Sequence, residues 1–593
     1  MTDTSPLAIN TVSTTPFEGQ KPGTSGLRKK TKVFETQEHY LENFVQSTFD
    51  ALPAEELAGA TLVVSGDGRY YNEKAIQVII KMAAANKVRK LFVGAGGLLA
   101  TPALSTIVRG RKAYGGIILT ASHNPGGPDE DFGIKYNVQN GGPAPANVTN
   151  AIFENTKTIT EYKICKNLPA IDISAPKTHD FAFEGGEGAF TVEVIDPVDD
   201  YLALMKDVFD FELLKKLMAR EDFHFVYDAL NGIAGPYATR IFGDELGVPA
   251  ECLMNCTPLP DFGGLHPDPN LTYASSLVKM MGLNRDGTAM NIDTPAIPDF
   301  GAAADGDADR NMILGRQFFV TPSDSVAVIA ANAGAIPYFK DGLKSVARSM
   351  PTSQALDLVA KDLGVKCFEV PTGWKFFGNL MDSAILGKDD LCPLICGEES
   401  FGTGASHIRE KDGPWAVLCW LSILGKANEN APIGSLVTVQ DVCMAHWKKY
   451  GRNYYCRYDY EGVAADGAKA MMAAMEEIIA NFGKSGELPD SAATGDFVLK
   501  EANNFEYSDP IDGSVSLKQG IRFIFEDGSR VIFRLSGTGS VGATIRLYLE
   551  KYEAADGTLD GTPASALGPL VKVALSISEL EKYSGRTEPT VIT

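Results

Sequence analysis

Three acidic residues alternate along the segment DGDADRN, at Asp305, Asp307 and Asp309. Alternate side chains of an extended backbone point to the same side, so these three carboxylates would converge. Converging carboxylates repel one another unless a divalent cation lies between them, and oxygen ligands suit Mg²⁺. A calcium loop of the EF-hand type would need Gly and Glu where this chain has Arg310 and Arg316. The segment predicts a Mg²⁺ site with coordination positions left for a phosphate; a solvated acidic turn is the alternative.

A serine follows a predicted buried strand in the segment TASHNPGG. The apolar run GGIILT at 115–120 predicts the strand, and Ser122 lies after it in a loop with Pro125 and two glycines. Ligands of open α/β sheets bind at the carboxyl ends of strands, so this hydroxyl is placed where a substrate would bind. No G-x-S-x-G elbow surrounds Ser122, and adjacent Ser and His side chains point opposite ways in extended backbone, so a hydrolase triad is not indicated. An ordinary polar turn is the alternative.

A third segment, GEESFGTGASHIREKDG at 397–413, combines glycines with polar and charged side chains. Glu398 and Ser400 suit sugar hydroxyls, whereas Arg409 and Lys411 suit a phosphate. The segment PTGWKFFG just upstream predicts another loop on the same face. This pattern indicates a site for a phosphorylated sugar, and a polar surface loop is the alternative.

A fourth segment, RLSGTGSVGATIR at 534–546, contains a formal G-x-G-x-x-G. As a dinucleotide-binding motif it fails, because the following ATIRLYLE alternates like a strand where that motif must open a helix. A phosphate-binding loop is the better interpretation, and a glycine-rich hairpin tip is the alternative. The groups that would bind the phosphate are the hydroxyls of Ser536, Thr538 and Ser540 and the guanidinium groups of Arg534 and Arg546.

The formal net charge is −21, which bears on the partners of the chain. Such a surface repels the phosphate backbone of nucleic acid and anionic lipid, so we expect neither nucleic acid nor membrane as a partner. The basic residues instead gather in glycine-rich loops, including Arg28, Lys29 and Lys30 in KPGTSGLRKK. A strand-end serine, a cation site and phosphate-binding loops together indicate phosphoryl transfer, which needs a nucleophile, a metal and positioned positive charge.

The elements that must position these loops alternate between strands and helices. Short apolar runs predict buried strands at 61–66, 90–96 and 115–120. A helix at 72–87 lies between the first two, and similar units begin at 224–232 and 364–370, which predicts parallel α/β architecture. The segment 520–537 alternates apolar and polar residues around an Asp-Gly turn and predicts an antiparallel hairpin. A chain of 593 residues exceeds one hydrophobic core, so several domains are expected.

The remaining features indicate a soluble protein of the cytoplasm. The nine cysteines are an odd number in a long chain, so buried free thiols are a better interpretation than a disulfide framework or zinc sites at the two C-x-x-x-C pairs. No apolar stretch reaches the roughly 18 residues of a membrane span. The residues before Lys21 lack a secretory apolar segment and the basic character of a transit peptide. We expect a monomer or a weak oligomer.

In this order, the motifs TASHNPGG, DGDADR, GEESFG and RLSGTGS resemble those of the eukaryotic-type phosphoglucomutases of the α-D-phosphohexomutase superfamily. The resemblance covers nearly the whole chain from about Lys21. It implies an α/β fold, with three mixed α/β domains of related topology and a C-terminal α+β domain around a central cleft. The expected domains are 1–205 with a phosphoserine loop, 206–335 with the metal loop, 336–430 with a sugar-binding loop and 431–593 with a phosphate-binding loop.

The resemblance also implies roles for individual residues. Ser122 would be the phosphorylated residue and would hold Mg²⁺ together with Asp305, Asp307 and Asp309. The implied catalytic residues are Ser122, His123, Lys135 and Lys411, of which His123 and Lys135 are candidates for proton transfer. The implied substrate-binding residues are Thr24, Arg28, Arg310, Thr372, Gly373, Glu398, Ser400, Lys411, Arg534, Ser536, Thr538 and Arg546.

The implied activity is the reversible interconversion of glucose 1-phosphate and glucose 6-phosphate through a phosphoserine and glucose 1,6-bisphosphate. One departure is visible, because Ala308 replaces a glycine that is usual in the metal loop of the family. Ala308 offers no ligand atom, so we expect the metal site to remain. The alternatives are a mutase for mannose or N-acetylglucosamine phosphates, a catalytically silent scaffold of the same fold and a metal-dependent phosphatase.

Overall fold

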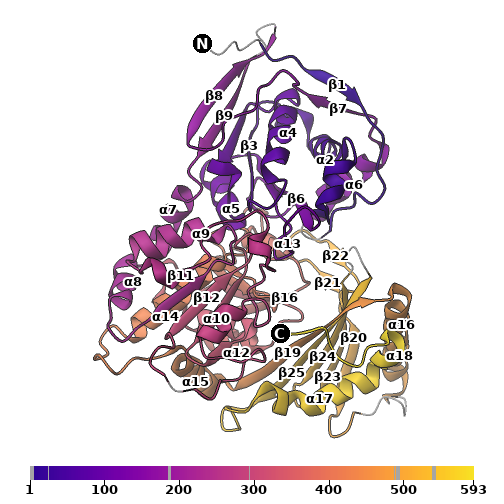
Figure 1. Cartoon of the computed structure of the whole chain (residues 1–593). Helices are drawn as coiled ribbons and strands as arrows, with labels where there is room; N and C mark the ends of the chain where they lie inside the picture. Colours follow the sequence, from indigo (N-terminus) through magenta and orange to yellow (C-terminus); the bar gives the residue numbers. More distant parts are fainter. Residues whose placement is uncertain are drawn as a thin grey trace.

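The computed structural model describes residues 6–23, 26–184, 188–292, 294–486, 488, 494–536 and 542–593. The described elements include four large sheets, three of mixed strand direction and one antiparallel, with helices packed against them (Figure 1). Within these residues, no helix combines the length and the apolar character that crossing a bilayer requires.

The first sheet has seven strands in the order β2-β6-β5-β3-β4-β9-β8. The three predicted strands are confirmed at its centre as β3 (Thr61–Gly66), β4 (Lys90–Gly94) and β5 (Gly115–Leu119). They are parallel, and the predicted helix between β3 and β4 is α4 (Asn72–Ala85). The next strand, β6 (Asp131–Val138), is antiparallel to β5. The TASHNPGG loop therefore connects a parallel strand to its antiparallel neighbour.

The second sheet repeats this arrangement with five strands in the order β11-β10-β12-β13-β14. Its strand β10 (Phe225–Asp228) is parallel to the central strand β12 (Phe300–Ala304). The following strand β13 (Asn311–Gly315) is antiparallel to β12. The acidic segment DGDADR is thus the turn from a parallel strand to an antiparallel one, as the serine loop is in the first sheet.

The third sheet has the same order again, β16-β15-β17-β18. Here β15 (Ser345–Ser349) is parallel to β17 (Leu394–Gly397), and β18 (Thr403–Ala405) is antiparallel to β17. The GEESFG segment is the turn between β17 and β18. Three predicted functional loops therefore occupy the same connection in three sheets, which confirms the related topology of these α/β units.

The fourth sheet is antiparallel, with the order β20-β23-β24-β25-β19-β26. The predicted hairpin is confirmed as β23 (Ile521–Phe525) and β24 (Arg530–Ser536), which pair across the Asp-Gly turn. Its other long strands are β19 (Arg452–Val463) and β25 (Ala543–Glu553). Two helices, α16 (Ala465–Ser485) and α17 (Pro563–Ser578), pack against this sheet (Figure 1). The C-terminal part is therefore an α+β unit, as expected.

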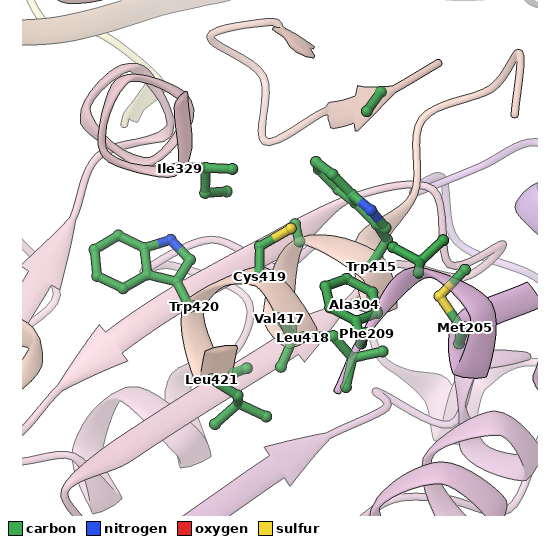
Figure 2. Packing of buried hydrophobic residues seen from close by; sticks show 14 of the residues in the cluster. Met205, Phe209, Ala304, Ile329, Trp415, Val417, Leu418, Cys419, Trp420 and Leu421 are labelled. Atoms are coloured by element: carbon green, nitrogen blue, oxygen red, sulfur yellow. The ribbon is translucent and has the colours of Figure 1, made fainter. Parts of the chain in front are cut away.

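One helix, α14 (Gly413–Ala427), lies at the centre of the first three units. It begins after Asp412, whose carboxylate accepts a hydrogen bond from the Trp415 backbone N–H at 3.0 Å, and it is apolar on all sides. Its side chains belong to a hydrophobic core with residues from the first three sheets. The fourth sheet has a cluster of its own on one face and shares another with the third sheet on the other face. Figure 2 shows Trp415, Cys419 and Trp420 of α14 close to Met205, Phe209, Ala304 and Ile329.

Candidate functional site

Loops from all four large sheets line one cavity of about 260 Å³. Most of the predicted site residues lie on its wall, namely Arg28, Ser122, His123, Lys135, Asp307, Asp309, Arg310, Thr372, Gly373, Glu398, Ser400, Lys411, Arg534, Ser536 and Arg546. Asp305 is fully buried beside Ser122. Thr24 and Thr538 lie outside the described residues. The fold thus brings four distant segments of the chain to one place.

Ser122 lies in the turn between β5 and β6 with a left-handed backbone conformation, at φ 55°. Its Oγ donates to Oδ2 of Asp305 at 3.0 Å and lies 3.4 Å from Nδ1 of His123. A Cβ at Gly306 would come within 2.8 Å of the Ser122 carbonyl oxygen, so glycine permits this approach of the two loops. The Ser122 hydroxyl is therefore held against the acidic loop, which is where a phosphorylated serine could contact a cation bound by that loop.

The three aspartates of the acidic loop are buried and close together. One oxygen of each carboxylate lies within 4.8 Å of the others. Oδ1 of Asp307 and Oδ1 of Asp309 accept no hydrogen bond from any of the described residues. Buried polar atoms are usually paired, so unpaired oxygens on converging carboxylates fit a divalent cation. Within the described ranges, no second group of His, Cys, Asp or Glu comes together in this way, and the nine cysteines are free thiols.

The acidic loop is anchored by helix α5 (Thr101–Gly110) of the first unit. Thr101 donates from Oγ1 to Oδ2 of Asp307 at 2.7 Å and from its backbone N–H to the Asp307 carbonyl at 3.0 Å. Burial acts to raise the pKa of Asp307, but the Lys135 ammonium and the Thr101 hydroxyl outweigh it and lower that pKa. Ala308 has φ 63°, a conformation that glycine adopts at lower cost.

Cationic side chains surround Ser122 and the acidic loop, and several are paired with buried carboxylates. Lys411 Nζ lies 3.2 Å from Oδ2 of Asp309. Lys135 Nζ lies 3.4 Å from Oε1 of Glu410, a buried residue on the cavity wall. Positive charge fixed around a small cavity favours a dianionic phosphate group.

His123 lies next to Ser122 in a strongly positive environment. Burial, Arg310 and Arg28 hold the pKa of His123 well below its usual range. Its ring stacks on that of His266, with the centroids 6.2 Å apart. The imidazole is therefore neutral at neutral pH and able to accept a proton.

The two sugar-loop segments meet as predicted. Oε1 of Glu398 accepts a hydrogen bond from the backbone N–H of Gly373 at 3.0 Å, and burial raises the pKa of the Glu398 carboxyl. Ser400 lies on the cavity wall beside Glu398. Arg409 does not bind at the cavity, contrary to expectation. It is buried, and its guanidinium donates from Nε to Oδ1 of Asp382 at 2.8 Å and from Nη1 to the Ser406 carbonyl at 2.8 Å.

In the fourth sheet, a row of charged side chains crosses three neighbouring strands. Asp459 on β19 is directly opposite Arg546 on β25, and Arg546 is directly opposite Arg534 on β24. Nε of Arg546 lies 3.8 Å from Oδ2 of Asp459, and Nε of Arg457 lies 3.0 Å from its Oδ1. The glycine-rich tip at 537–541 lies outside the described residues. The described part of this segment offers two adjacent guanidinium groups to the cavity.

Sequence reasoning missed the buried polar residues that hold these loops in place, namely Asp67, Arg69, Thr101, Glu410 and Asp459. Asp67 and Arg69 follow a strand, Thr101 begins a helix, Glu410 lies in a loop and Asp459 lies within a strand. Most of them are far along the chain from the loop that they contact. Asp67 carried one usable signal, since it directly follows the predicted strand TLVVSG. A carboxylate at a strand end can be recognised without a structure, but its partners cannot.

Known protein families match the chain in four consecutive parts. Models of the phosphoglucomutase/phosphomannomutase α/β/α domains I, II and III match residues 19–163, 199–317 and 322–450. A model of the C-terminal domain of phosphoglucomutase-1 matches residues 452–590.

Individual relatives are similar over the whole chain. A probable cytoplasmic phosphoglucomutase of Arabidopsis thaliana is 60% identical to this chain, and the match covers 99% of both chains. A cytoplasmic phosphoglucomutase of Mesembryanthemum crystallinum matches with the same identity and coverage. A crystal structure of the Paramecium exocytosis-sensitive phosphoprotein pp63/parafusin, a phosphoglucomutase in an open form, matches with a TM-score of 0.88 at 50% identity, over 99% of this chain and 100% of that one. A structure from Thermus thermophilus shares the fold at 21% identity, with a TM-score of 0.61 over 95% of this chain and 100% of that one.

Proposed function

Because the chain belongs to the phosphoglucomutase/phosphomannomutase family, we infer that it is a phosphoglucomutase, which interconverts α-D-glucose 1-phosphate and D-glucose 6-phosphate. The plant relatives carry the word cytoplasmic in their names, and by that likeness we assign this chain to the cytoplasm. Its partners are then small sugar phosphates. We expect a monomer or a weak oligomer, which sedimentation velocity would test.

We propose that Ser122 carries the phosphoryl group that is transferred. In the first transfer, the bond between Ser122 Oγ and phosphorus breaks as the 6-oxygen of glucose 1-phosphate bonds to phosphorus, and the hydroxyl proton passes to a base. Glucose 1,6-bisphosphate then turns round within the cavity. The bond between its 1-oxygen and phosphorus then breaks as phosphorus bonds to Ser122 Oγ, the 1-oxygen takes up the proton from the base, and glucose 6-phosphate is released. The observation that carries this proposal is the 3.0 Å contact between Ser122 Oγ and Asp305 within a cavity lined by cations.

The acidic loop is the proposed metal site. Asp305, Asp307 and Asp309, with an oxygen of phosphoserine 122, would hold Mg²⁺, and the unpaired Oδ1 atoms of Asp307 and Asp309 support this assignment. When bound, Mg²⁺ supplies neutralisation of charge on the transferred phosphoryl group. Arg28 and Arg310 line the same cavity and add positive charge to its wall.

His123 is the proposed acceptor of the hydroxyl proton. Its lowered pKa keeps the imidazole neutral, and its Nδ1 lies 3.4 Å from Ser122 Oγ. Lys411 has the opposite character, because burial acts to lower its pKa but Asp309 raises it overall, so the ammonium persists. We therefore assign Lys411 to charge stabilisation, and Lys135, which is paired with Glu410, to the same role.

The substrate would be held at its two ends. Glu398 and Ser400 are placed to bind sugar hydroxyls, next to Thr372 and Gly373 on the cavity wall. Arg534, Ser536 and Arg546 would grip the phosphate that does not react, with Thr538 and Thr24 as predicted partners outside the described residues. Because the bisphosphate reverses within the cavity, the same grip would serve both half-reactions.

The variant Ser122→Ala tests the proposal directly. We expect loss of turnover in a coupled assay with glucose 1-phosphate and added glucose 1,6-bisphosphate, with the fold intact. Intact-mass analysis of the active enzyme should show one phosphate on the Ser122 peptide, and Ser47→Ala, which removes another buried hydroxyl of the same unit, should leave both results unchanged. Phosphate on a different residue, with activity above a few per cent, would refute the assignment. Release of inorganic phosphate without glucose 6-phosphate would instead indicate a phosphatase.

A further inference from the structure

One buried ion pair holds the Ser122 peptide from both sides. The Ser122 N–H donates to Thr120 Oγ1 at 2.8 Å, and the Ser122 carbonyl accepts from Arg69 Nη2 at 2.8 Å. Both partners converge on Asp67, because Thr120 Oγ1 donates to its Oδ2 at 2.6 Å and Arg69 Nε donates to the same oxygen at 2.9 Å. Two chains of hydrogen bonds thus run from the single carboxylate of Asp67 to the two peptide groups of Ser122.

Arg69 also holds the rest of the loop. Its Nη1 donates to the carbonyl oxygens of Asn124 at 3.3 Å and Asp131 at 2.9 Å. Its guanidinium lies over the ring of Phe262, 5.2 Å from the centroid. The side chains of Arg69 and Asp67 are 0% exposed, so every guanidinium nitrogen is used within the protein. These hydrogen bonds reach the first half and the end of the loop between β5 and β6.

Stability alone does not explain such an arrangement. The desolvation of a buried ion pair offsets much of its attraction, and apolar residues of similar volume often stabilise a fold as well. Apolar residues, however, could not hold both peptide groups of one residue in a left-handed conformation, which residues other than glycine avoid. The network therefore specifies the conformation of the Ser122 loop.

We propose that Asp67, Arg69 and Thr120 are positioning residues that fix Ser122 for phosphoryl transfer, an inference that rests on the proposed role of Ser122. None of the three is among the described residues that line the cavity, so they would act through the backbone of Ser122 and not on the sugar phosphate. Their loss should then lower kcat and leave KM nearly unchanged. A shift of about 1 Å in a reacting group costs roughly 100-fold in rate.

Thr120→Val tests this inference, because it removes the shared hydroxyl and keeps the shape of the side chain. We expect single-turnover transfer from phosphorylated enzyme to glucose 1-phosphate to slow by about 10- to 100-fold, with KM changed by less than about threefold. Thr120→Ser should restore the rate, since it retains the oxygen. Thr48→Val is the matched control, since Thr48 is a buried threonine of the same unit whose hydroxyl donates to the Phe44 carbonyl at 2.8 Å. It should transfer at the wild-type rate.

A double-mutant cycle of Asp67→Asn and Thr120→Val provides a second measurement. If both residues act on one peptide group, the loss in the double variant should be smaller than the product of the single losses. Transfer by Thr120→Val at the wild-type rate, or no rescue by Thr120→Ser, would overturn the inference. The inference would also be overturned if Thr120→Val and Thr48→Val, at equal loss of unfolding free energy, slowed transfer equally. If the wild-type enzyme itself transferred no phosphate from Ser122, the proposed function would fail instead.

Discussion

Asp307→Asn should weaken Mg²⁺ binding, because it neutralises one of the three carboxylates of the proposed metal site. The Asp307 carboxylate accepts a hydrogen bond from the Thr101 hydroxyl through Oδ2 at 2.7 Å, which leaves Oδ1 to face the proposed cation. The amide of the variant can keep a hydrogen bond to Thr101, because a hydroxyl both donates and accepts. The variant therefore removes the negative charge while the side chain stays in place.

The magnitude follows from the lost charge. Two unit charges 4 Å apart interact by about 4 kcal/mol at an effective dielectric constant of about 20, and the double charge of Mg²⁺ raises this to about 8 kcal/mol. Dehydration of the ions on binding offsets part of this attraction. The variant also relieves repulsion among the three carboxylates, but this relief is present with and without the metal and cancels in the affinity. We expect a loss of at least about 3 kcal/mol, which is at least about 150-fold in Mg²⁺ affinity.

The assay is isothermal titration of the chelator-treated enzyme with Mg²⁺, together with the Mg²⁺ dependence of kcat. Asp324→Asn is the matched control, because Asp324 is also buried and is hydrogen-bonded to Trp447 and Thr321, away from the acidic loop. It should leave the Mg²⁺ dependence unchanged. Equal Mg²⁺ affinity in Asp307→Asn and the wild type would refute the assignment of the acidic loop as the metal site.

Three further predictions concern the substrate and the proton. Arg546→Ala should lower kcat/KM in both directions by roughly 10- to 150-fold, the value of a lost charge-assisted hydrogen bond, and should release more free glucose 1,6-bisphosphate per single turnover; normal kinetics would make the 534–546 segment a structural hairpin. Glu398→Gln should impair glucose phosphates while Ser122 is still phosphorylated; an unchanged preference for glucose over mannose phosphate would argue against sugar binding by Glu398. Because its surroundings lower the pKa of His123, the NMR signals of its ring should not titrate as the pH falls through the usual histidine value of 6.5, and a midpoint there would contradict a neutral base at His123.

The strands and the loops that follow them could be predicted from the sequence because both have local signals. Apolar runs identified β3, β4 and β5, and glycines with charged residues identified the acidic loop and the GEESFG loop. Each of these loops lies at the carboxyl end of a strand, and that position makes a loop residue of an α/β protein accessible to a ligand. The chemistry of the cavity could therefore be predicted before its shape.

The contacts between distant segments had no local signal. Thr101 was one threonine among many until the structure placed it 2.7 Å from Asp307, and Arg409 looked like a phosphate ligand although it pairs with Asp382. The common order of strands in three sheets was also invisible, because strand order depends on pairing and not on residue identity. Contacts between distant segments and the order of strands depend on strand register and packing, which no short stretch of sequence specifies.

The shared core around α14 has a consequence for how the molecule unfolds. Because α14 packs against β12, β13 and β18 and is enclosed by residues from three sheets, these units should unfold as one cooperative block. Amide hydrogens of α14 should exchange with deuterium only through global unfolding of that block. The fourth sheet has a cluster of its own on one face and shares a second cluster with the third sheet on the other, so the helices on its outer face, α16 and α17, should exchange sooner. The sheet that carries Arg534 and Arg546 is therefore joined to the third unit through this shared cluster, and the two should keep their relative position during exchange of the outer helices.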